Sequence, residues 1–388
     1  MKQYYYGRQS IDDEDIERVV EVLRSDFLSQ GPVLPAFEQR VADYCGAKHC
    51  LAVSNGTVAL ELACRALGVT EGSTGWTTPL SFVASANCIR YCGGRADFVD
   101  IDPATLNMDP SKLEKRLQEA QAREALPKVI IPVHFAGASC DMKAIAALAG
   151  KYGIRVVEDA CHAMGGAYCG DPIGCCKYSD LTVFSLHPVK SITSGEGGLI
   201  LCNDTELYAA MKLMRTHGIV RGADCTDQSI GPWHAEMTGE GYNFKLTEIQ
   251  SALGLSQMGK LDSFVAKRRE LAARYLENLD GHDWVAFQQT DDPAASARHI
   301  MVGLFDFDRI GMNKREVHKA LADRGINLSC HYYPIHLNPF YRTLGFRPGM
   351  FPAAEAYYPM AFTLPLHPSL DLGDIDHICN QIIDVCQR

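Results

Sequence analysis

Apolar residues along the first half of the chain alternate between helical spacing and short continuous runs. Residues 12–24 show helical spacing after a group of acids, and Gly31-Pro32 separates them from a second predicted helix that ends near residue 46. Short apolar runs predict strands at residues 51–53, 96–99, 128–133 and 154–158, and the segments between them predict helices at residues 56–67, 110–120 and 141–152. This alternation predicts an α/β fold with a largely parallel sheet covered by helices on both faces.

The pattern changes after residue 245. Residues 245–278 have the spacing of one long helix, which would carry the chain into a smaller unit. That unit contains predicted strands near 300–305 and 326–330 and predicted helices near 313–324 and 372–386. We therefore expect a large domain over residues 1–255, with the N-terminal segment, and a small α+β domain over residues 256–388.

Composition and charge exclude several classes of protein. The net charge is −10, from 37 basic and 47 acidic residues, and no run of Lys or Arg indicates a nucleic-acid surface. The sequence shows no signal peptide and no apolar run long enough to span a membrane. The fifteen cysteines are scattered and odd in number, so we expect reduced thiols and a cytoplasmic protein.

One candidate for covalent chemistry is Lys190, in the segment F-S-L-H-P-V-K-S-I-T-S-G-E-G-G (184–198). It lies between an apolar strand at 181–184 and a glycine-rich turn that leads to another strand at 198–202. A buried lysine has a lowered pKa and reacts with aldehydes. Taken alone, however, a loop lysine is usually solvated, so the motif needs support from other segments.

Two further motifs follow predicted strands. Asp159, in V-V-E-D-A-C-H-A-M-G (156–165), is placed either to pair with a protonated pyridine nitrogen or to cap a helix. In A-V-S-N-G-T-V-A-L (52–60), the N–H groups at the start of a helix, with the Thr57 hydroxyl, could bind a phosphate, or Ser54 or Asn55 could simply cap that helix. Pyridoxal 5'-phosphate needs an amine, a partner for its ring nitrogen and a phosphate site, so the three motifs together predict this cofactor.

With these motifs the chain resembles the DegT/StrS family of sugar aminotransferases, which have the aspartate-aminotransferase (type I) fold. The resemblance extends almost from end to end, through S-N-G-T (54–57), T-T-P-L-S-F-V-A-S-A-N (77–87), E-D-A-C-H-A-M-G (158–165), G-Y-N-F-K-L-T-E-I-Q-S-A-L-G (241–254), C-H-Y-Y-P-I-H (330–336) and L-P-L-H-P-S-L (364–370). It implies a pyridoxal-phosphate-dependent transaminase of a nucleotide-linked keto-sugar.

The resemblance implies a role for each matching residue. Lys190 forms the covalent imine with the cofactor and is the catalytic residue, and Asp159 pairs with the pyridinium nitrogen. The other residues expected at the cofactor are Gly56, Thr57 and Ser185 at the phosphate, Phe82 stacked on the ring, His162 near its hydroxyl edge, and Asn243, which would reach the phosphate in a neighbouring subunit. Residues expected at the sugar or the amino donor are His187, Lys245, His331 and Tyr332. Lys245 stands where many relatives have arginine, and a lysine cannot make the bidentate contact of an arginine. Glu196 is either functional or structural.

The segment H-P-V-K followed by I-T-S-G-E-G-G looks like the aminotransferase of pseudaminic-acid biosynthesis. That resemblance implies a UDP-linked 4-keto-6-deoxy-N-acetylhexosamine as substrate, L-glutamate as donor and a homodimer with shared active sites. The alternatives are another 4- or 3-aminotransferase of nucleotide-deoxysugar biosynthesis, and a non-catalytic regulatory protein of the same fold. A sugar dehydratase of the same family would have histidine in place of Lys190, and a simple nucleotide-binding domain would lack the lysine segment.

Overall fold

The computed structural model describes residues 2–290 and 292–387, and its centre is a seven-stranded sheet. From one edge to the other the strands are β2 (His49–Val53), β10 (Gly198–Cys202), β9 (Leu181–Ser185), β6 (Arg155–Asp159), β5 (Val129–Ile131), β3 (Thr74–Thr77) and β4 (Arg95–Phe98). Strand β10 is antiparallel to both of its neighbours, and all other neighbouring pairs are parallel. The prediction of a mostly parallel sheet is confirmed.

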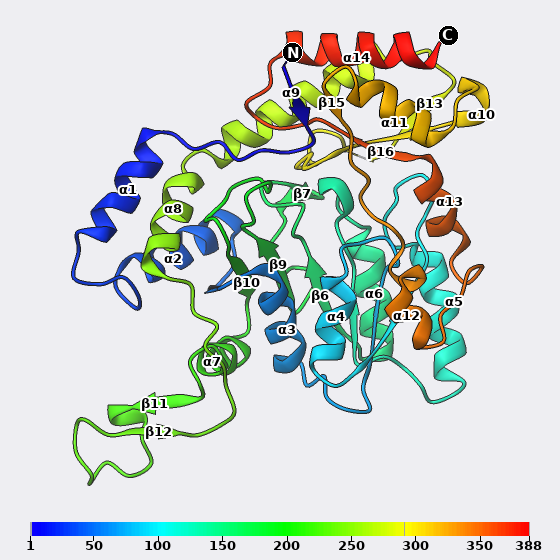
Figure 1. The fold of residues 1–388 in the computed structure, drawn as a ribbon. Helices are drawn as coiled ribbons and strands as arrows, with labels where there is room; N and C mark the ends of the chain where they lie inside the picture. The colour runs from blue at the N-terminus through cyan, green and yellow to red at the C-terminus, as the bar shows by residue number, and fades with distance from the viewer. Residues whose placement is uncertain (1, 291, 388) are drawn as a thin grey trace.

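Helices cover both faces of this sheet (Figure 1). Alternate residues of a strand point to opposite faces: Leu51 and Val53 of β2 belong to the apolar core on one face, and Cys50 and Ala52 to the core on the other. The first core contains residues of α3 (Gly56–Ala66), α4 (Ala84–Tyr91) and α7 (Thr205–Met214). The cores on the second face contain residues of α2 (Val33–Cys45), α5 (Pro110–Gln121), α6 (Met142–Tyr152) and α8 (Glu248–Met258).

The C-terminal part packs around a separate apolar core. It contains a three-stranded sheet in the order β13 (Val285–Phe287), β14 (Met301–Phe305) and β16 (Ala361–Leu364), with helices α9 (Leu261–Asn278), α10 (Phe307–Ile310), α11 (Lys314–Ala322) and α14 (Leu372–Cys386). Strand β1 (Tyr4–Tyr5) pairs with β15 (Ile326–Asn327), so the N-terminal strand lies with this part of the molecule (Figure 1). The division of the chain between residues 255 and 256 stays a prediction.

The predicted helix over residues 245–278 is in fact two helices, α8 and α9, separated at Gly259 and Lys260. Glycine is a poor helix former, and the Lys260 ammonium forms ion pairs with Asp12 and Asp15 at the start of α1 (Asp13–Leu23). The strand predicted at 326–330 shortens to β15, a two-residue strand that pairs with β1. The regular structure of β3 and α4 was not predicted.

Three features complete the fold. Helices α12 (Pro339–Thr343) and α13 (Pro352–Met360) lie beside the large sheet, and β7 (Ala167–Tyr168) pairs with β8 (Asp171–Pro172). An arm formed by β11 (Ile219–Arg221) and β12 (Ala235–Met237) projects away from the molecule (Figure 1). All fifteen cysteines are free, and within residues 2–290 and 292–387 no helix has the length and apolar character needed to cross a bilayer.

Candidate active site

A cavity of about 770 Å³ opens where the carboxyl ends of β2, β6 and β9 meet. Parallel α/β sheets commonly bind ligands at this edge, because the polar loops that follow the strands converge there. Ten of the twelve predicted site residues line the cavity: Gly56, Thr57, Phe82, Asp159, His162, Ser185, His187, Lys190, His331 and Tyr332. The fold therefore brings together segments that are almost 280 residues apart in the chain.

Lys190 lies in the loop that joins the antiparallel strands β9 and β10. Its side chain is half-buried at the cavity wall. Burial lowers the pKa of Lys190 below its usual value; Cys161 and Asp159 oppose this shift, and the charge of Arg268 adds to it. A lysine with a lowered pKa carries a larger fraction of neutral amine, which is the form that attacks an aldehyde.

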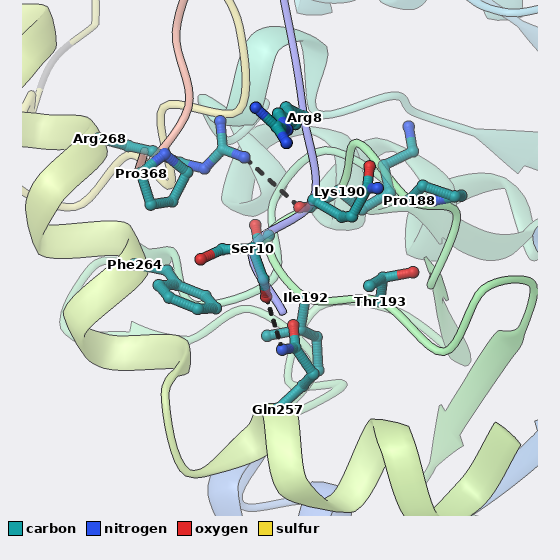
Figure 2. Close-up of a pocket in the computed structure, with 12 residues that line it drawn as sticks. Arg8, Ser10, Pro188, Lys190, Ile192, Thr193, Gln257, Phe264, Arg268 and Pro368 are labelled. Carbon is teal, nitrogen blue, oxygen red and sulfur yellow. Dashed lines mark hydrogen bonds between the residues drawn. The ribbon is translucent and has the colours of Figure 1, made fainter. Parts of the chain in front are cut away.

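Behind the lysine loop, Arg268 of α9 is almost completely buried, with 1% of its surface exposed. Its guanidinium donates to the carbonyl oxygens of His299 and Leu366, at 2.9 and 2.8 Å, and at 3.4 Å to that of Lys190. Figure 2 shows Arg268 beside Lys190, and Arg268 lines a small second pocket but not the large cavity. Arg268 therefore joins the C-terminal part of the molecule to the backbone of the lysine loop.

Asp159 is the last residue of β6 and is buried, with 5% of its surface exposed. Its Oδ2 atom accepts a hydrogen bond from the Ser85 hydroxyl at 2.6 Å, and its Oδ1 atom accepts the backbone N–H of Cys161 at 3.2 Å. Both oxygens are therefore held in place at the edge of the cavity. The sequence analysis did not single out Ser85, although it lies three residues after Phe82 in the same segment, 77–87.

The preceding residue, Glu158, points away from the cavity and binds His134. The Nε2 atom of His134 lies 2.8 Å from Glu158 Oε2, and His134 Nδ1 accepts the backbone N–H of Cys140 at 3.1 Å. The backbone N–H of His134 also donates to the Asp159 carbonyl at 3.1 Å. This buried pair fixes the end of β6 next to Asp159.

Helix α3 begins at Gly56, directly after β2. Asn55 caps the helix by accepting the backbone N–H of Val58 at 2.9 Å, which confirms one of the two interpretations of this segment. The N–H groups of Gly56 and Thr57 have no hydrogen-bond partner among residues 2–290 and 292–387. A Cβ atom at Gly56 would lie 3.0 Å from the Ser185 Cβ atom, so glycine keeps this corner of the cavity open.

Two histidines on the cavity wall are held in the neutral form. Burial, with the charge of Lys190, lowers the pKa of His162 well below its usual value, and burial with the charges of Lys190 and Arg268 does the same for His299. His162 Nε2 lies 3.1 Å from the Tyr332 hydroxyl, and its ring centroid is 4.4 Å from that of His299. His162 Nδ1 is buried and has no partner in the described part of the chain.

His331 and Phe82 both line the cavity. Burial, with the charge of Lys190, lowers the pKa of His331 to about 4, and its Nδ1 atom lies 2.8 Å from the Thr363 hydroxyl. Phe82 is 55% exposed, and its ring centroid lies 6.0 Å from that of Tyr332. An aromatic ring left this open has a free face on which a flat ligand can stack.

Asn243 and Lys245 are the two predicted site residues that do not line the cavity. They follow the projecting arm, and the Lys245 ammonium donates to Asn243 Oδ1 at 2.5 Å. The backbone of Lys245 bridges to Val53, next to the loop that starts α3. Cavity residues that the sequence did not single out include Tyr6, Ser85, Cys161 and His299.

These residues fit pyridoxal phosphate. The cavity holds an amine with a lowered pKa, a buried carboxylate, an open aromatic face and two free N–H groups at a helix start. The unpartnered Nδ1 atom of His162 adds one polar group able to meet a ring substituent. Each functional group of the cofactor would therefore find a complementary group.

Comparison with known proteins also indicates an aminotransferase. Residues 9–383 match the DegT/DnrJ/EryC1/StrS aminotransferase family. The spore coat polysaccharide biosynthesis protein SpsC of Bacillus subtilis is 36% identical over 98% of this chain and 96% of its own length. The UDP-4-amino-4,6-dideoxy-N-acetyl-beta-L-altrosamine transaminase of Campylobacter jejuni (strain 81-176) is 33% identical over 99% of this chain and 97% of its own.

Solved structures are similar over the same length. Helicobacter pylori PseC, an aminotransferase involved in the biosynthesis of pseudoaminic acid, superposes with a TM-score of 0.91 at 31% identity, covering 100% of both chains. The PLP-form of the putative sugar aminotransferase Spr1654 from Streptococcus pneumoniae has a TM-score of 0.88 at 27% identity, covering 99% of both chains.

Proposed function

Because the chain belongs to the DegT/DnrJ/EryC1/StrS aminotransferase family, we propose that it acts as a UDP-4-amino-4,6-dideoxy-N-acetyl-beta-L-altrosamine transaminase. It is a sugar aminotransferase of nucleotide-sugar biosynthesis and depends on pyridoxal phosphate. The proposed substrate is a UDP-linked 4-keto-6-deoxy-N-acetylhexosamine, and the proposed amino donor is L-glutamate. The observation that carries this choice is the similarity to the Campylobacter transaminase and to PseC along almost the whole chain.

A second candidate is another 4- or 3-aminotransferase of nucleotide-deoxysugar biosynthesis. This candidate is supported by the sequence identity to SpsC, which is higher than the identity to the Campylobacter transaminase. Both candidates share the chemistry of one amino transfer and differ in the keto-sugar that the open side of the cavity accepts.

We assign the following roles in the cavity. Pyridoxal phosphate, when bound, supplies an aldehyde that takes up the amino group and a pyridine ring that accepts the electrons left when a proton leaves the donor's alpha carbon. Lys190 Nζ would hold the cofactor and, as a free amine, would accept and return that proton as general base and acid. Its lowered pKa supports this role, because a neutral amine is needed to accept a proton.

The other cavity residues bind and orient. Asp159 carries the negative charge that keeps the pyridine nitrogen protonated, and Gly56, Thr57 and Ser185 bind the phosphate. Phe82 stacks on the ring, and His162, which is neutral, meets its hydroxyl edge. His187, His331 and Tyr332 face the substrate side of the cavity, and Asn243 with Lys245 would act in the cavity of a second copy in a homodimer.

The proposed function is tested in two half-reactions with the purified holoenzyme. L-Glutamate alone should shift the visible absorption band of the bound cofactor to shorter wavelength and release an equal amount of 2-oxoglutarate. A panel of UDP- and dTDP-linked 4-keto and 3-keto sugars then identifies the acceptor, with the product assigned by mass spectrometry and NMR. We expect amination at C4 of the UDP-linked 6-deoxy-N-acetylhexosamine.

Each half of the proposal has its own contrary result. Amination of only dTDP-linked sugars, or only at C3, would overturn the substrate assignment and leave the aminotransferase intact. A Lys190→Ala variant that still transaminates at the wild-type rate would overturn the role of Lys190. If the spectrum does not change with glutamate but does change with another amino acid, L-glutamate is not the amino donor.

A further inference from the structure

The projecting arm lacks an apolar core of its own. Between residues 219 and 240, Cys225 is the one buried residue, with 5% of its surface exposed. The strands pair over three residues each, and large side chains such as Trp233 and Met237 are 78% and 70% exposed. A two-stranded ribbon of this size is marginally stable in water, so the arm needs another source of order.

Three metal-ligating side chains meet inside the arm. The Cys225 sulfur, a His234 ring nitrogen and a Glu236 carboxylate oxygen all lie within 4.8 Å of one another. Cys225 comes just after the 3-10 turn Gly222–Asp224. His234 immediately precedes the returning strand β12, and Glu236 lies within it. The two sides of the ribbon therefore contribute ligands to one point, as the two sides of a structural metal site do.

The surrounding backbone holds the Glu236 carboxylate in position. Its Oε2 atom accepts the N–H of Thr226 at 2.7 Å and also the Thr226 hydroxyl, and its Oε1 atom accepts the N–H of Asp227 at 3.0 Å. These hydrogen bonds fix the orientation of the Glu236 carboxylate. In metal sites, hydrogen bonds of this kind orient the carboxylates that bind the ion.

The Glu236 carboxylate also contacts one of the other ligands directly. The His234 Nε2 atom lies 2.9 Å from Glu236 Oε1. A small movement of the His234 ring would let a metal ion bind between these two atoms. The Cys225 thiol is 3.7 Å from the carbonyl oxygens of Val220 and His234, which are weak contacts that a thiolate bound to a metal can give up.

The donor set selects the metal. A thiolate with an imidazole and a carboxylate suits Zn²⁺, whose sites combine sulfur, nitrogen and oxygen ligands in tetrahedral geometry. Hard cations such as Mg²⁺ and Ca²⁺ prefer oxygen ligands alone. Three protein ligands leave a fourth position, for water or for a group on a docked partner.

We propose that Cys225, His234 and Glu236 bind one Zn²⁺ ion that cross-links the two sides of the β11–β12 arm. This site is separate from the large cavity and does not depend on the proposed sugar-transfer reaction. Its ligands are within twelve residues of each other, so binding would order the arm without moving the body of the molecule.

The test uses the full-length holoenzyme, treated with a chelator and then given one equivalent of Zn²⁺ or Co²⁺. We expect one Zn²⁺ per chain after gel filtration, with a dissociation constant on the order of 1 µM or tighter. Co²⁺ should give visible bands of a tetrahedral site at wavelengths beyond the absorption of the cofactor, and a thiolate-to-metal band. Zn²⁺ should also slow cleavage by trypsin after Arg221, an exposed residue of β11.

Variants separate this site from unspecific binding. Cys225→Ser and His234→Gln should lose the stoichiometric metal and the protection from trypsin, while their cofactor absorption and circular dichroism stay those of the wild type. Cys169→Ser, which removes an exposed thiol outside the cluster, should keep both. The proposal is overturned if the wild type retains no metal at one equivalent, or if Cys225→Ser and His234→Gln bind it as the wild type does, since the metal would then be an adventitious ion only.

Discussion

At the scale of single residues, the carboxylate of Asp159 shows how the fold prepares a charge for a ligand. The side chain is buried, and a hydroxyl and a backbone N–H hold its two oxygens. Burying an ionised carboxylate is costly unless hydrogen bonds or a cation stabilise it. The hydrogen bonds from Ser85 and Cys161 supply part of this stabilisation, and a protonated pyridine nitrogen would supply the rest.

We therefore predict a large effect for Asp159→Asn and a small one for Ser85→Ala. Asn keeps the shape of the side chain but removes the charge, so the rate of the glutamate half-reaction should fall by about a hundredfold or more. Ser85→Ala removes one orienting hydrogen bond and should cost about tenfold or less. Stopped-flow absorbance with saturating glutamate measures both rates. Equal rates for Asp159→Asn and the wild type would contradict the role of the charge.

His367 makes the stability of the protein depend on pH. It is 6% exposed, and burial, with the nearby charges of Arg268 and Arg8, lowers its pKa from 6.5 to about 4. As the pH falls, the unfolded chain takes up the proton first, so the stability that is present above pH 6.5 is lost between about pH 6.5 and 4. Lowering the pH from 7.5 to 5 should cost the folded state roughly 1–2 kcal/mol through this group, allowing for partial solvent screening.

The variant His367→Gln checks this sign. Its free energy of unfolding, from urea titrations at pH 7.5 and 5, should change by roughly 1–2 kcal/mol less than that of the wild type. His217→Gln, at an exposed position, serves as the matched control and should keep the pH dependence of the wild type. If His367→Gln and the wild type lose the same stability between these two pH values, His367 is not the group responsible.

At the scale of elements, Lys260 joins three helices at the point where α8 ends and α9 begins. Its ammonium is paired with Asp12 and, at 3.0 Å, with Asp15, whose side chain is fully buried. Gln257 of α8 also donates to Asp15, at 2.7 Å. Gln257 and Lys260 therefore both hold the Asp15 side chain, from the end of α8 and from the break that follows it.

Lys260→Met should therefore destabilise the protein by about 3 kcal/mol, because the buried Asp15 carboxylate loses its cation. Lys267→Met is the matched control in α9. It removes an exposed pair with Glu270 and should cost less than about 1 kcal/mol. Urea unfolding of both variants at pH 7.5 measures the difference. A loss for Lys260→Met no greater than that for Lys267→Met would mean that the Asp15 carboxylate is stabilised by its other partners.

At the scale of the whole molecule, the cavity lacks two of its expected residues within one chain. Asn243 and Lys245 lie outside it, on the segment that follows the projecting arm. Their position would be explained by a homodimer in which Asn243 and Lys245 of each subunit lie at the cavity of the other. In a twofold dimer the exchange is mutual, so each subunit completes its partner's cavity.

Complementation between two inactive variants tests this arrangement. Lys190→Ala and Asn243→Ala homodimers should both be nearly inactive. A heterodimer of the two, isolated after co-expression with two different tags, contains one cavity with both native residues. It should recover about half of the wild-type activity. Heterodimers that stay as inactive as the two parents would show that Asn243 does not act across subunits.

Much of the fold was accessible from sequence because it depends on local patterns. Short apolar runs at residues 51–53 and 154–158 are buried strands, and helical spacing at 56–67 and 141–152 gives α3 and α6 within one or two residues. Local chemistry also placed Asp159 at the end of a strand and Lys190 and Gly56 in segments that follow strands. Parallel strands end on one side of a sheet. The sequence thus determined the fold class, a candidate for the reactive amine and the side of the sheet on which to look.

The tertiary structure alone decided what surrounds these residues. Ser85 on Asp159, Arg268 behind Lys190 and His299 beside His162 come from segments far away in the chain, and no local periodicity relates such positions. The lowered pKa of Lys190 likewise depends on how much solvent the packed elements exclude, which no single segment determines. A sequence specifies residue types in order, and only folding sets the distances and the burial on which their chemistry depends.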